Sequence, residues 1–396
     1  MSDRTDWCLD PNLDFLNHGS FGATPRVVMR ERVDLLERLE RDPISFLAPE
    51  RDLEASLDHV RHILAELINV APQDLAFVRN ATDGVNAVLR SLAFEQGDEV
   101  LITNHGYNAC SNAVRFATQR SNAITRIAEV PFPLEGPAQV LQAIEAAISD
   151  RTRLLVIDHV TSATGLVFPV RDIIKLAHQH GIRVMIDGAH APGMLPLDLR
   201  AMQPDYYTAN HHKWLCGPKA SGFLYVRADL QSETQPTIIS HAYNRPKPDR
   251  SQFTSSFDWM GTHDPTPILA LPAAIQFLSN LRPGGLATHM HRNHEMAVES
   301  QVILSKSLNV EPPCPAEMIG SLVSIPLEGL SLSSAYQLGA ALYAEERIEA
   351  PVFEGIPFNL TKQDSPPCVR VSLQCYNNLD QVQRFGEVLR KRLNLG

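Results

Sequence analysis

The fold is decided by two short runs, VMIDGAHAPG at residues 184–193 and DYYTANHHKW at residues 205–214. The first run begins with the apolar residues 184–186, which is typical of a strand buried in a sheet, and residues 205–209 of the second are a further candidate strand. The first run ends in a carboxylate, Asp187, and the second leads through two imidazoles to an amine, Lys213. Two neighbouring strand ends are therefore expected to bring a carboxylate and an amine to one rim.

The sequence around these runs, from about residue 52 to residue 227, alternates between helical and strand patterns. Apolar residues recur with helical spacing at Leu53, Leu57, Val60, Leu64 and Leu67. Short apolar runs typical of strands follow at residues 75–78, 100–102 and 154–157. Segments with helix-like composition lie at residues 140–148 and 173–180. Such alternation predicts an α/β fold with a mainly parallel sheet covered by helices on both faces. Ligands of such sheets bind at the carboxyl ends of the strands.

The chain is expected to have three parts. Residues 1–50 form an N-terminal segment, in which Thr24 resembles a helix cap before a charged helix that ends near residue 41. Residues 51–285 form a large domain, and residues 286–396 form a smaller α+β domain after the turn at Pro283-Gly-Gly285. The proline-rich stretch at residues 241–252 is expected to be a surface loop, with a lid as one option.

The composition excludes several functions. The chain has 396 residues with 35 Lys and Arg against 45 Asp and Glu, a net charge of −10, which argues against nucleic-acid binding. No apolar run is long enough to suggest a membrane helix, and the N-terminus does not resemble a signal peptide. The six cysteines are scattered and show no metal-binding spacing. We therefore expect a cytoplasmic enzyme without a metal site, with free thiols and no membrane partner.

The residues at the two strand ends suggest a cofactor. A lysine among apolar and aromatic neighbours can have a lowered pKa and attack a carbonyl, as expected for Lys213. An aspartate such as Asp187 can hold a pyridine nitrogen in its protonated form. Pyridoxal 5′-phosphate (PLP) requires this pair of an imine-forming lysine and an acidic partner.

The motifs around this pair resemble a known family, the class V aminotransferases of the fold-type I PLP enzymes, and within it the isopenicillin N epimerase-like group. The matching motifs are LNHGSFG at 16–22, RNATDGVN at 79–86, DHVTSATG at 158–165, IDGAHAPG at 186–193, NHHKWLCGPK at 210–219 and VRVSLQCYN at 369–377. The resemblance covers nearly the whole chain. It implies a seven-stranded type of sheet in the large domain and an N-terminal segment that joins the small domain to the substrate pocket.

The resemblance also implies roles for residues around the cofactor. Lys213 resembles the lysine that forms the internal aldimine, and Asp187 the aspartate paired with the pyridine nitrogen. His190 resembles a polar residue near the phenolic oxygen, and Tyr107 an aromatic residue on the face of the pyridine ring. The phosphate is expected at a helix start that follows a strand, where free N–H groups face an anion. The residues expected to contact the phosphate are Asn80, Ala81, Thr82, Asn210 and His212.

The remaining implied residues concern the substrate and a second subunit. Arg370 resembles the arginine that binds the substrate carboxylate, for which its planar fork is suited. Asn17 and His18 lie in the segment that resembles the lining of the substrate pocket. Thr262, in the sequence Trp-Met-Gly-Thr, resembles a threonine that reaches the phosphate of the neighbouring subunit. The resemblance therefore implies a homodimer with shared active sites.

The sequence leaves the reaction open. We expect an amino-acid substrate and chemistry at Cα, with an epimerase or aminotransferase first and a C–S lyase of the cysteine desulfhydrase type as the alternative. A persulfide-forming desulfurase is disfavoured because residues 347–365 contain no cysteine. Epimerisation needs an acid or base on each face of Cα, and only Lys213 is identified. A non-catalytic PLP-fold protein is less favoured, as is a metal-dependent hydrolase built on His289, His291 and His294.

Overall fold

The computed structural model describes residues 4–356 and 365–395. Its centre is a seven-stranded sheet with the strand order β2-β8-β7-β6-β5-β3-β4. Only β8 runs antiparallel to its neighbours, so the sheet is mainly parallel, as expected. The strands are β2 (Leu75–Val78), β3 (Glu99–Thr103), β4 (Ile124–Ala128), β5 (Thr152–Asp158), β6 (Arg183–Asp187), β7 (Tyr206–Asn210) and β8 (Gly222–Val226).

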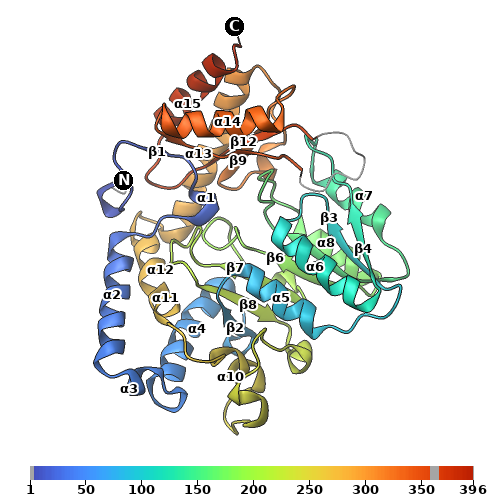
Figure 1. Ribbon diagram of the computed structural model, residues 1–396, viewed down its shortest axis with the longest axis vertical. Coiled ribbons are helices and arrows are strands. Elements are labelled where there is room, and N and C mark those ends of the chain that lie inside the picture. Colours follow the sequence, from blue (N-terminus) through green and yellow to red (C-terminus); the bar gives the residue numbers. More distant parts are fainter. Residues whose placement is uncertain (1–3, 357–364, 396) are drawn as a thin grey trace.

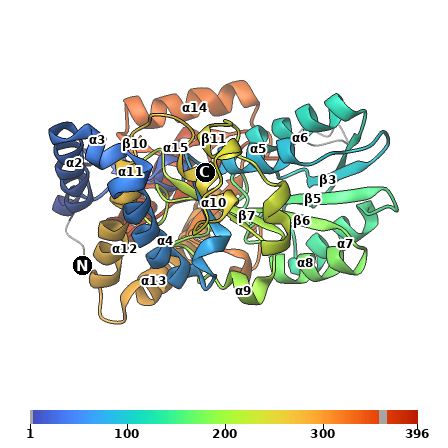
Figure 2. The ribbon, with the colours of Figure 1, turned by 90° about the horizontal axis from the view of Figure 1, so that it is seen from below.

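Helices cover both faces of this sheet (Figure 2). On one face lie α5 (Ala81–Ser91) and α6 (Asn108–Ser121), and on the other lie α7 (Pro137–Ala147), α8 (Val170–Gln179) and the short α9 (Leu199–Met202). Strand β3 shows why the strands read as continuous apolar runs. Its Val100 and Ile102 belong to the core beneath α5 and α6, whereas Leu101 belongs to the core on the opposite face. A strand buried on both faces needs apolar residues at every position.

A second sheet lies at the top of Figure 1 with the C-terminal helices. It is antiparallel, with the order β11-β12-β9. Its strands are β9 (Leu322–Pro326), β11 (Val352–Phe353) and β12 (Cys368–Ser372), and its helices are α13 (Gly285–Leu308), α14 (Leu332–Ala344) and α15 (Leu379–Arg392). The expected division of the chain after residue 285 stays a prediction, although α13 begins at that point.

The N-terminal segment runs from this second sheet to the large one. Strand β1 (Asp14–Phe15) pairs with β10 (Ile348–Glu349), and α1 (His18–Phe21) follows at the centre of Figure 1. Helix α2 (Arg26–Arg41) begins after Pro25, so the prediction that Thr24 is its cap is wrong by one residue. The Thr24 hydroxyl instead donates to the carbonyl oxygen of Gly217 at 3.2 Å. The remaining helices are α3 (Pro43–Leu47), α4 (Glu54–Ile68), α10 (Gln252–Asp258), α11 (Thr266–Leu269) and α12 (Leu271–Asn280).

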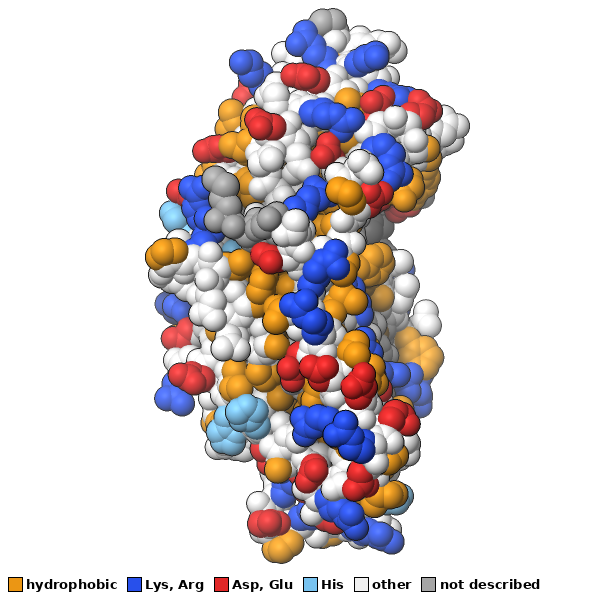
Figure 3. Space-filling view, turned by 90° about the vertical axis from the view of Figure 1, so that its left-hand side faces the viewer, with side chains coloured by type: hydrophobic (Ala, Val, Ile, Leu, Met, Phe, Trp, Pro, Cys, Tyr) orange, Lys and Arg blue, Asp and Glu red, His pale blue; other side chains and the backbone are white. Residues whose placement is uncertain are grey.

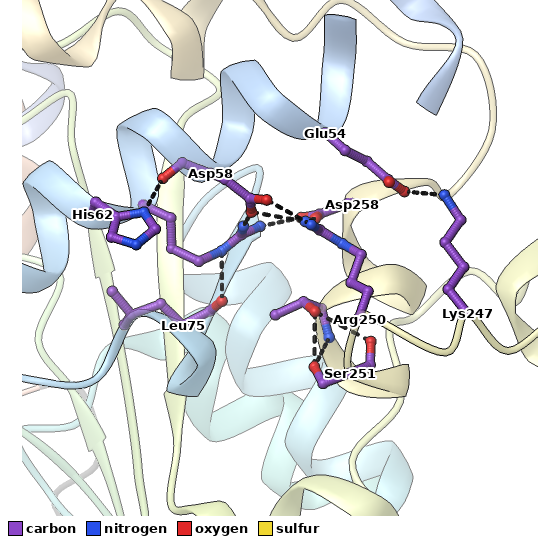
Figure 4. Close-up of polar contacts among 10 residues, drawn as sticks. Glu54, Asp58, His62, Leu75, Lys247, Arg250, Ser251 and Asp258 are labelled. Carbon is purple, nitrogen blue, oxygen red and sulfur yellow. Dashed lines mark hydrogen bonds and ion pairs between the residues drawn. The ribbon is translucent and has the colours of Figure 1, made fainter. Parts of the chain in front are cut away.

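An ion-pair network fixes the stretch before α10 against α4 (Figure 4). The guanidinium of Arg250 contacts Asp58 on α4 at 2.7 Å and also contacts Asp258. The buried Arg61 on α4 contacts both aspartates, with 2.5 Å to Asp258, and Lys247 contacts Glu54 at 2.6 Å. Residues 241–252 therefore lie against α4, and a lid is not the role that their contacts support.

The structure also bears on membrane and metal binding. None of the helices within residues 4–356 and 365–395 is both long and apolar enough to span a membrane. The three histidines of α13 contact different partners, since His291 faces Glu295, His294 faces the carbonyl of Ile319, and His289 faces Asn293. In the described part of the chain, no group of three or more metal-ligating side chains is placed to hold a metal ion.

Candidate active site

The carboxyl ends of the parallel strands meet at a cavity of about 320 Å³. Asp158 and Asp187 end β5 and β6 and lie side by side in the register of the two strands. Nine of the ten residues expected at the cofactor line this cavity. They are Asn80, Ala81, Thr82, Tyr107, Asp187, His190, Asn210, His212 and Lys213.

Lys213 is the amine of the cavity. It is 9% exposed, and burial lowers its pKa to about 8, with Arg370 adding to the effect and Asp187 opposing it. Its Nζ lies 2.8 Å from Nε2 of His190, whose pKa burial holds well below the usual range. The indole N–H of Trp214 donates to Nδ1 of His190 at 3.4 Å, so Nε2 carries the imidazole proton. The contact therefore suits a neutral amine, which is the nucleophilic form.

The turn that carries Lys213 is held by close backbone packing. Gly193 has φ +81°, and a Cβ there would lie 2.4 Å from the carbonyl oxygen of Trp214. Gly22 has φ +68°, and a Cβ there would lie 1.9 Å from the carbonyl oxygen of His212. Within the turn, Cys216 also has a positive φ of 56° and donates its N–H to the carbonyl of Lys213 at 3.0 Å. Side chains at either glycine would displace the lysine.

His18 lies beneath this turn and lines neither cavity of the site as described. Burial lowers its pKa to about 3, so its imidazole is neutral. Its Nε2 contacts the carbonyl oxygen of Lys213 at 2.8 Å and its Nδ1 contacts the hydroxyl of Tyr376 at 2.7 Å. The structure therefore places His18 as support for the lysine backbone, away from the expected contact with substrate.

The start of α5 provides an anion site. Asn80 caps the helix by accepting the N–H of Asp83 at 2.9 Å, and Asn210 accepts the N–H of Ala81 at 2.9 Å. Thr82 lies in the first turn, where helix N–H groups lack intrahelical partners. The Nδ1 of His212 is buried in the cavity without a hydrogen-bond partner among the described residues. These groups fit the phosphate of PLP.

Lys219 is a cavity residue that the sequence did not reveal as part of the site. It lines the same cavity as His212 and donates to the carbonyl of Gly22 at 3.0 Å. Burial lowers its pKa. Lys219 is the last residue of the NHHKWLCGPK motif, which could have indicated a role in the site. From the sequence alone, however, a lysine six residues after Lys213 is equally well explained as a solvent-exposed side chain.

Asp187 is the carboxylate of the cavity and is 3% exposed. Its Oδ1 accepts the N–H of Ala189 at 3.0 Å, and its Oδ2 accepts the thiol of Cys110 at 3.0 Å. Burial and the charge of Asp187 raise the pKa of the neighbouring Asp158 well above its usual range. The carboxylate of Asp187 is therefore placed to pair with a protonated pyridine nitrogen.

A second cavity of about 330 Å³ adjoins the first and shares Ser20, Tyr107 and Ser162 with it. Arg370 lines the second cavity and is 4% exposed, and burial lowers its pKa to about 10, so it is cationic near neutral pH. It donates to the carbonyl of Ser162 at 2.5 Å and to the hydroxyl of Ser20 at 2.9 Å. Among the described residues no carboxylate pairs with it, and its Nε has no partner. A buried, cationic guanidinium without a carboxylate partner is suited to bind the carboxylate of a ligand.

Asn17 and Thr262 line neither of the two cavities among the described residues. The side-chain oxygen of Asn17 is 3.4 Å from Arg370, and its amide donates to Glu349 at 2.9 Å. Asn17 therefore orients the arginine from behind the substrate cavity. Thr262 is exposed and lines neither cavity of its own subunit in the described structure.

Comparisons with known proteins agree with this geometry. A family model described as Aminotransferase class-V matches residues 22–385. An isopenicillin N epimerase of Amycolatopsis lactamdurans is 32% identical, covering 98% of this chain and 97% of that protein. A probable chloroplastic L-cysteine desulfhydrase of Arabidopsis thaliana is 28% identical, covering 96% of this chain and 83% of that protein. A solved C-DES mutant with glycine covalently linked to its PLP cofactor has a TM-score of 0.80 at 23% identity, covering 98% of this chain and 99% of that one, which shows the fold.

Proposed function

The chain belongs to the class V aminotransferase family of PLP-dependent enzymes, and from this premise we propose that it inverts the configuration at Cα of an amino-acid substrate. One observation carries the proposal. Two groups that can carry a proton, Lys213 and Tyr107, line the cofactor cavity from opposite sides of β6. Lys213 follows β7 and Tyr107 follows β3, and β6 lies between these strands in the sheet.

The residues divide the work of such a reaction. When bound, PLP supplies an electron sink that stabilises negative charge at Cα. Asp187 would supply the carboxylate for the pyridine nitrogen, and the backbone N–H of Thr82 in the first turn of α5, with Nδ1 of His212, would face the phosphate. Arg370 binds the substrate carboxylate and so orients the Cα–H bond. Lys213 moves the proton on its side of Cα, with His190 beside its Nζ at 2.8 Å.

Tyr107 is proposed as the second proton carrier. Its side chain is 45% exposed and lines both cavities. Burial, with Cys110 and Asp187, raises the pKa of its phenol, while Arg370 opposes that rise. A phenol that stays protonated can return a proton to the face opposite Lys213, and the nearby guanidinium can stabilise the phenolate in the reverse direction.

The experiment uses single enantiomers of a panel of amino acids in D₂O. Inversion is expected to appear as loss of circular dichroism with deuterium at Cα and without keto acid. Tyr107→Phe is expected to abolish inversion while Lys213 still exchanges the proton of one enantiomer. Keto acid with the amine left on the cofactor would indicate transamination and overturn the proposal.

A second candidate is β-elimination at a sulfur-containing amino acid. The relative named as a probable L-cysteine desulfhydrase motivates it, and Lys213 alone, with a pKa of about 8, suffices as the base. Cysteine or cystine as substrate would then give pyruvate, ammonia and sulfide or persulfide. Tyr107→Phe would leave this activity largely intact, which separates the two candidates.

The homodimer and the cytoplasmic location are further proposals. The face of the molecule in Figure 3 shows hydrophobic side chains among charged ones. On α2, Met29 is 45% exposed and Val33 is 51% exposed. A groove of about 540 Å³ runs beside them to Lys219 at the edge of the cofactor cavity. An apolar surface next to the site supports a second subunit there, and Thr262 would reach the neighbouring phosphate.

A further inference from the structure

We propose that Cys110 is a positioning residue of this site, whose thiol orients the carboxylate of Asp187 toward the pyridine nitrogen. The inference rests on the proposed role of Asp187 and applies to either candidate reaction. It concerns a residue on α6 that is 77 positions away from Asp187 in the sequence.

The geometry is that of a buried hydrogen bond. Cys110 lies in the first turn of α6, which begins at Asn108, and it is 5% exposed. Its Sγ lies 3.0 Å from Oδ2 of Asp187. The second oxygen, Oδ1, accepts the N–H of Ala189. Both oxygens of Asp187 are thus held by donors from different elements, which fixes the plane of the carboxylate.

The charges around the contact require the thiol to be the donor. Burial, and then the charge of Asp187, raise the pKa of Cys110 well above its usual range, so it stays protonated. Asp158 on β5 acts in the same direction as Asp187 on the pKa of Cys110, and the amine of Lys213 opposes both. A thiolate here would repel Asp187, whereas a thiol stabilises it.

Removing the thiol should alter the orientation of the Asp187 carboxylate more than the stability of the fold. Without the donor, Asp187 is free to rotate, and its hold on the pyridine nitrogen weakens. We expect Cys110→Ala to lower the affinity of the apo-protein for PLP and the turnover number each by about 10-fold, with KM changed much less. Cys110→Ser keeps a donor at the same place and should recover most of both.

The contact can be observed without turnover. The S–H stretching band of the apo-protein, isolated as the difference between wild type and Cys110→Ser, should lie at the lower frequency of a hydrogen-bonded thiol. The pH titration of the cofactor absorbance should shift in Cys110→Ala and return in Cys110→Ser. Cys314→Ala is the matched control, because Cys314 is also buried but contacts Gln301 instead.

The outcomes test the role of Cys110 and the role of Asp187 separately. A free S–H band, or equal effects of Cys110→Ala and Cys314→Ala, would overturn the role of Cys110. If Cys110→Ser does not restore PLP affinity and turnover, the role of Cys110 is also overturned. The loss in Cys110→Ala would then come from altered packing and not from the missing hydrogen-bond donor. If Asp187→Asn leaves the cofactor titration unchanged, the proposed role of Asp187 fails first, whatever the S–H band shows.

Discussion

At the scale of single residues, the strand ends made much of the site predictable. Lys213, Asp187 and the start of α5 each follow an apolar run, and parallel strands bring such positions to one edge. Asp158 also ends a predicted strand and could have been found by the same reasoning. Cys110 could not, because its sequence neighbourhood is an ordinary helix and only packing across the sheet brings its thiol to Asp187.

The lowered pKa of Lys213 predicts how the apo-protein captures PLP. The neutral amine attacks the cofactor aldehyde, and with a pKa of about 8 the neutral fraction rises with pH through that value. The capture rate should therefore increase about 10-fold per pH unit below pH 8 and level off above it. Stopped-flow absorbance of apo-protein mixed with PLP measures this rate. A plateau reached only near pH 10 would show an unperturbed lysine.

Lys213 should also be the residue that retains the cofactor after borohydride reduction. Peptide mapping is expected to find the pyridoxyl group on this lysine, because its Nζ lies inside the cavity beside His190. Lys219 lines the same cavity and is the natural competitor. A label on Lys219 would contradict the assignment, and Lys219→Ala serves as the control that should keep the label.

Asp187 should be needed for chemistry far more than for folding. Asp187→Ala removes the negative charge that keeps the pyridine nitrogen protonated, and an opposite charge of this kind shifts a pKa by about 1 to 3 units. We expect turnover to fall by at least about 100-fold. The thermal midpoint should change little, because the substitution also removes a buried charge. Near-normal turnover would exclude the electron-sink role.

At the scale of elements, the sequence predicted five strands of the large sheet, β2, β3, β5, β6 and β7, and missed β4 and β8. Strand β4 lies at the edge of the sheet and alternates exposed and half-buried residues, so it shows no apolar run. Strand β8 is apolar and buried, but its antiparallel direction follows from the way the chain returns through residues 211–221 after β7, which periodicity does not encode. The ion pairs that fix residues 241–252 were equally hidden, because their partners lie on α4.

The network of Figure 4 should stabilise the junction between α4 and α10. Arg61 is 2% exposed, contacts Asp258 at 2.5 Å and donates to the carbonyl of Leu75 at 3.1 Å. Arg61→Met leaves these acceptors buried, which costs about 3–5 kcal/mol. A lower urea midpoint is the expected result. The half-exposed pair of Lys247 and Glu54 offers the control, since Lys247→Ala should cost about 0–1 kcal/mol. If Arg61→Met and Lys247→Ala lower the stability by the same amount, the buried network contributes no more than the Lys247–Glu54 pair.

At the scale of the whole molecule, the layered α/β fold followed from the alternation of helices and strands, and the comparisons confirm it. The resemblance implied that the N-terminal segment joins the small domain to the substrate pocket, but not how its backbone pairs. Strand β1 has only two residues and pairs with β10, more than 300 positions further on. Such long-range pairing leaves no local pattern. A second subunit is a proposal, and the exposed Thr262 is the position at which it can be tested.

The final prediction is that Thr262 acts across a dimer interface. Thr262 is exposed and lies outside both cavities described above. The resemblance of its motif to a phosphate-contacting segment is what motivates the prediction. A hydrogen bond to a charged group contributes about 1.5–3 kcal/mol, so Thr262→Ala should weaken PLP retention by about 10- to 100-fold. Equilibrium dialysis of the holoenzyme measures that loss, and Thr266→Ala, on a buried threonine nearby, controls for local packing.

Mixed dimers then decide between the two subunits. If Thr262 serves the neighbouring site, a Lys213→Ala subunit paired with a Thr262→Ala subunit makes one site with both lesions and one with neither. The intact site should regain wild-type PLP affinity and turnover, because it combines the lysine of one chain with the threonine of the other. If Thr262 acts within its own chain, each site keeps one lesion and no site recovers. Recovery to half of the wild-type activity per mixed dimer therefore supports a shared site, and a strictly monomeric active enzyme in sedimentation would exclude it.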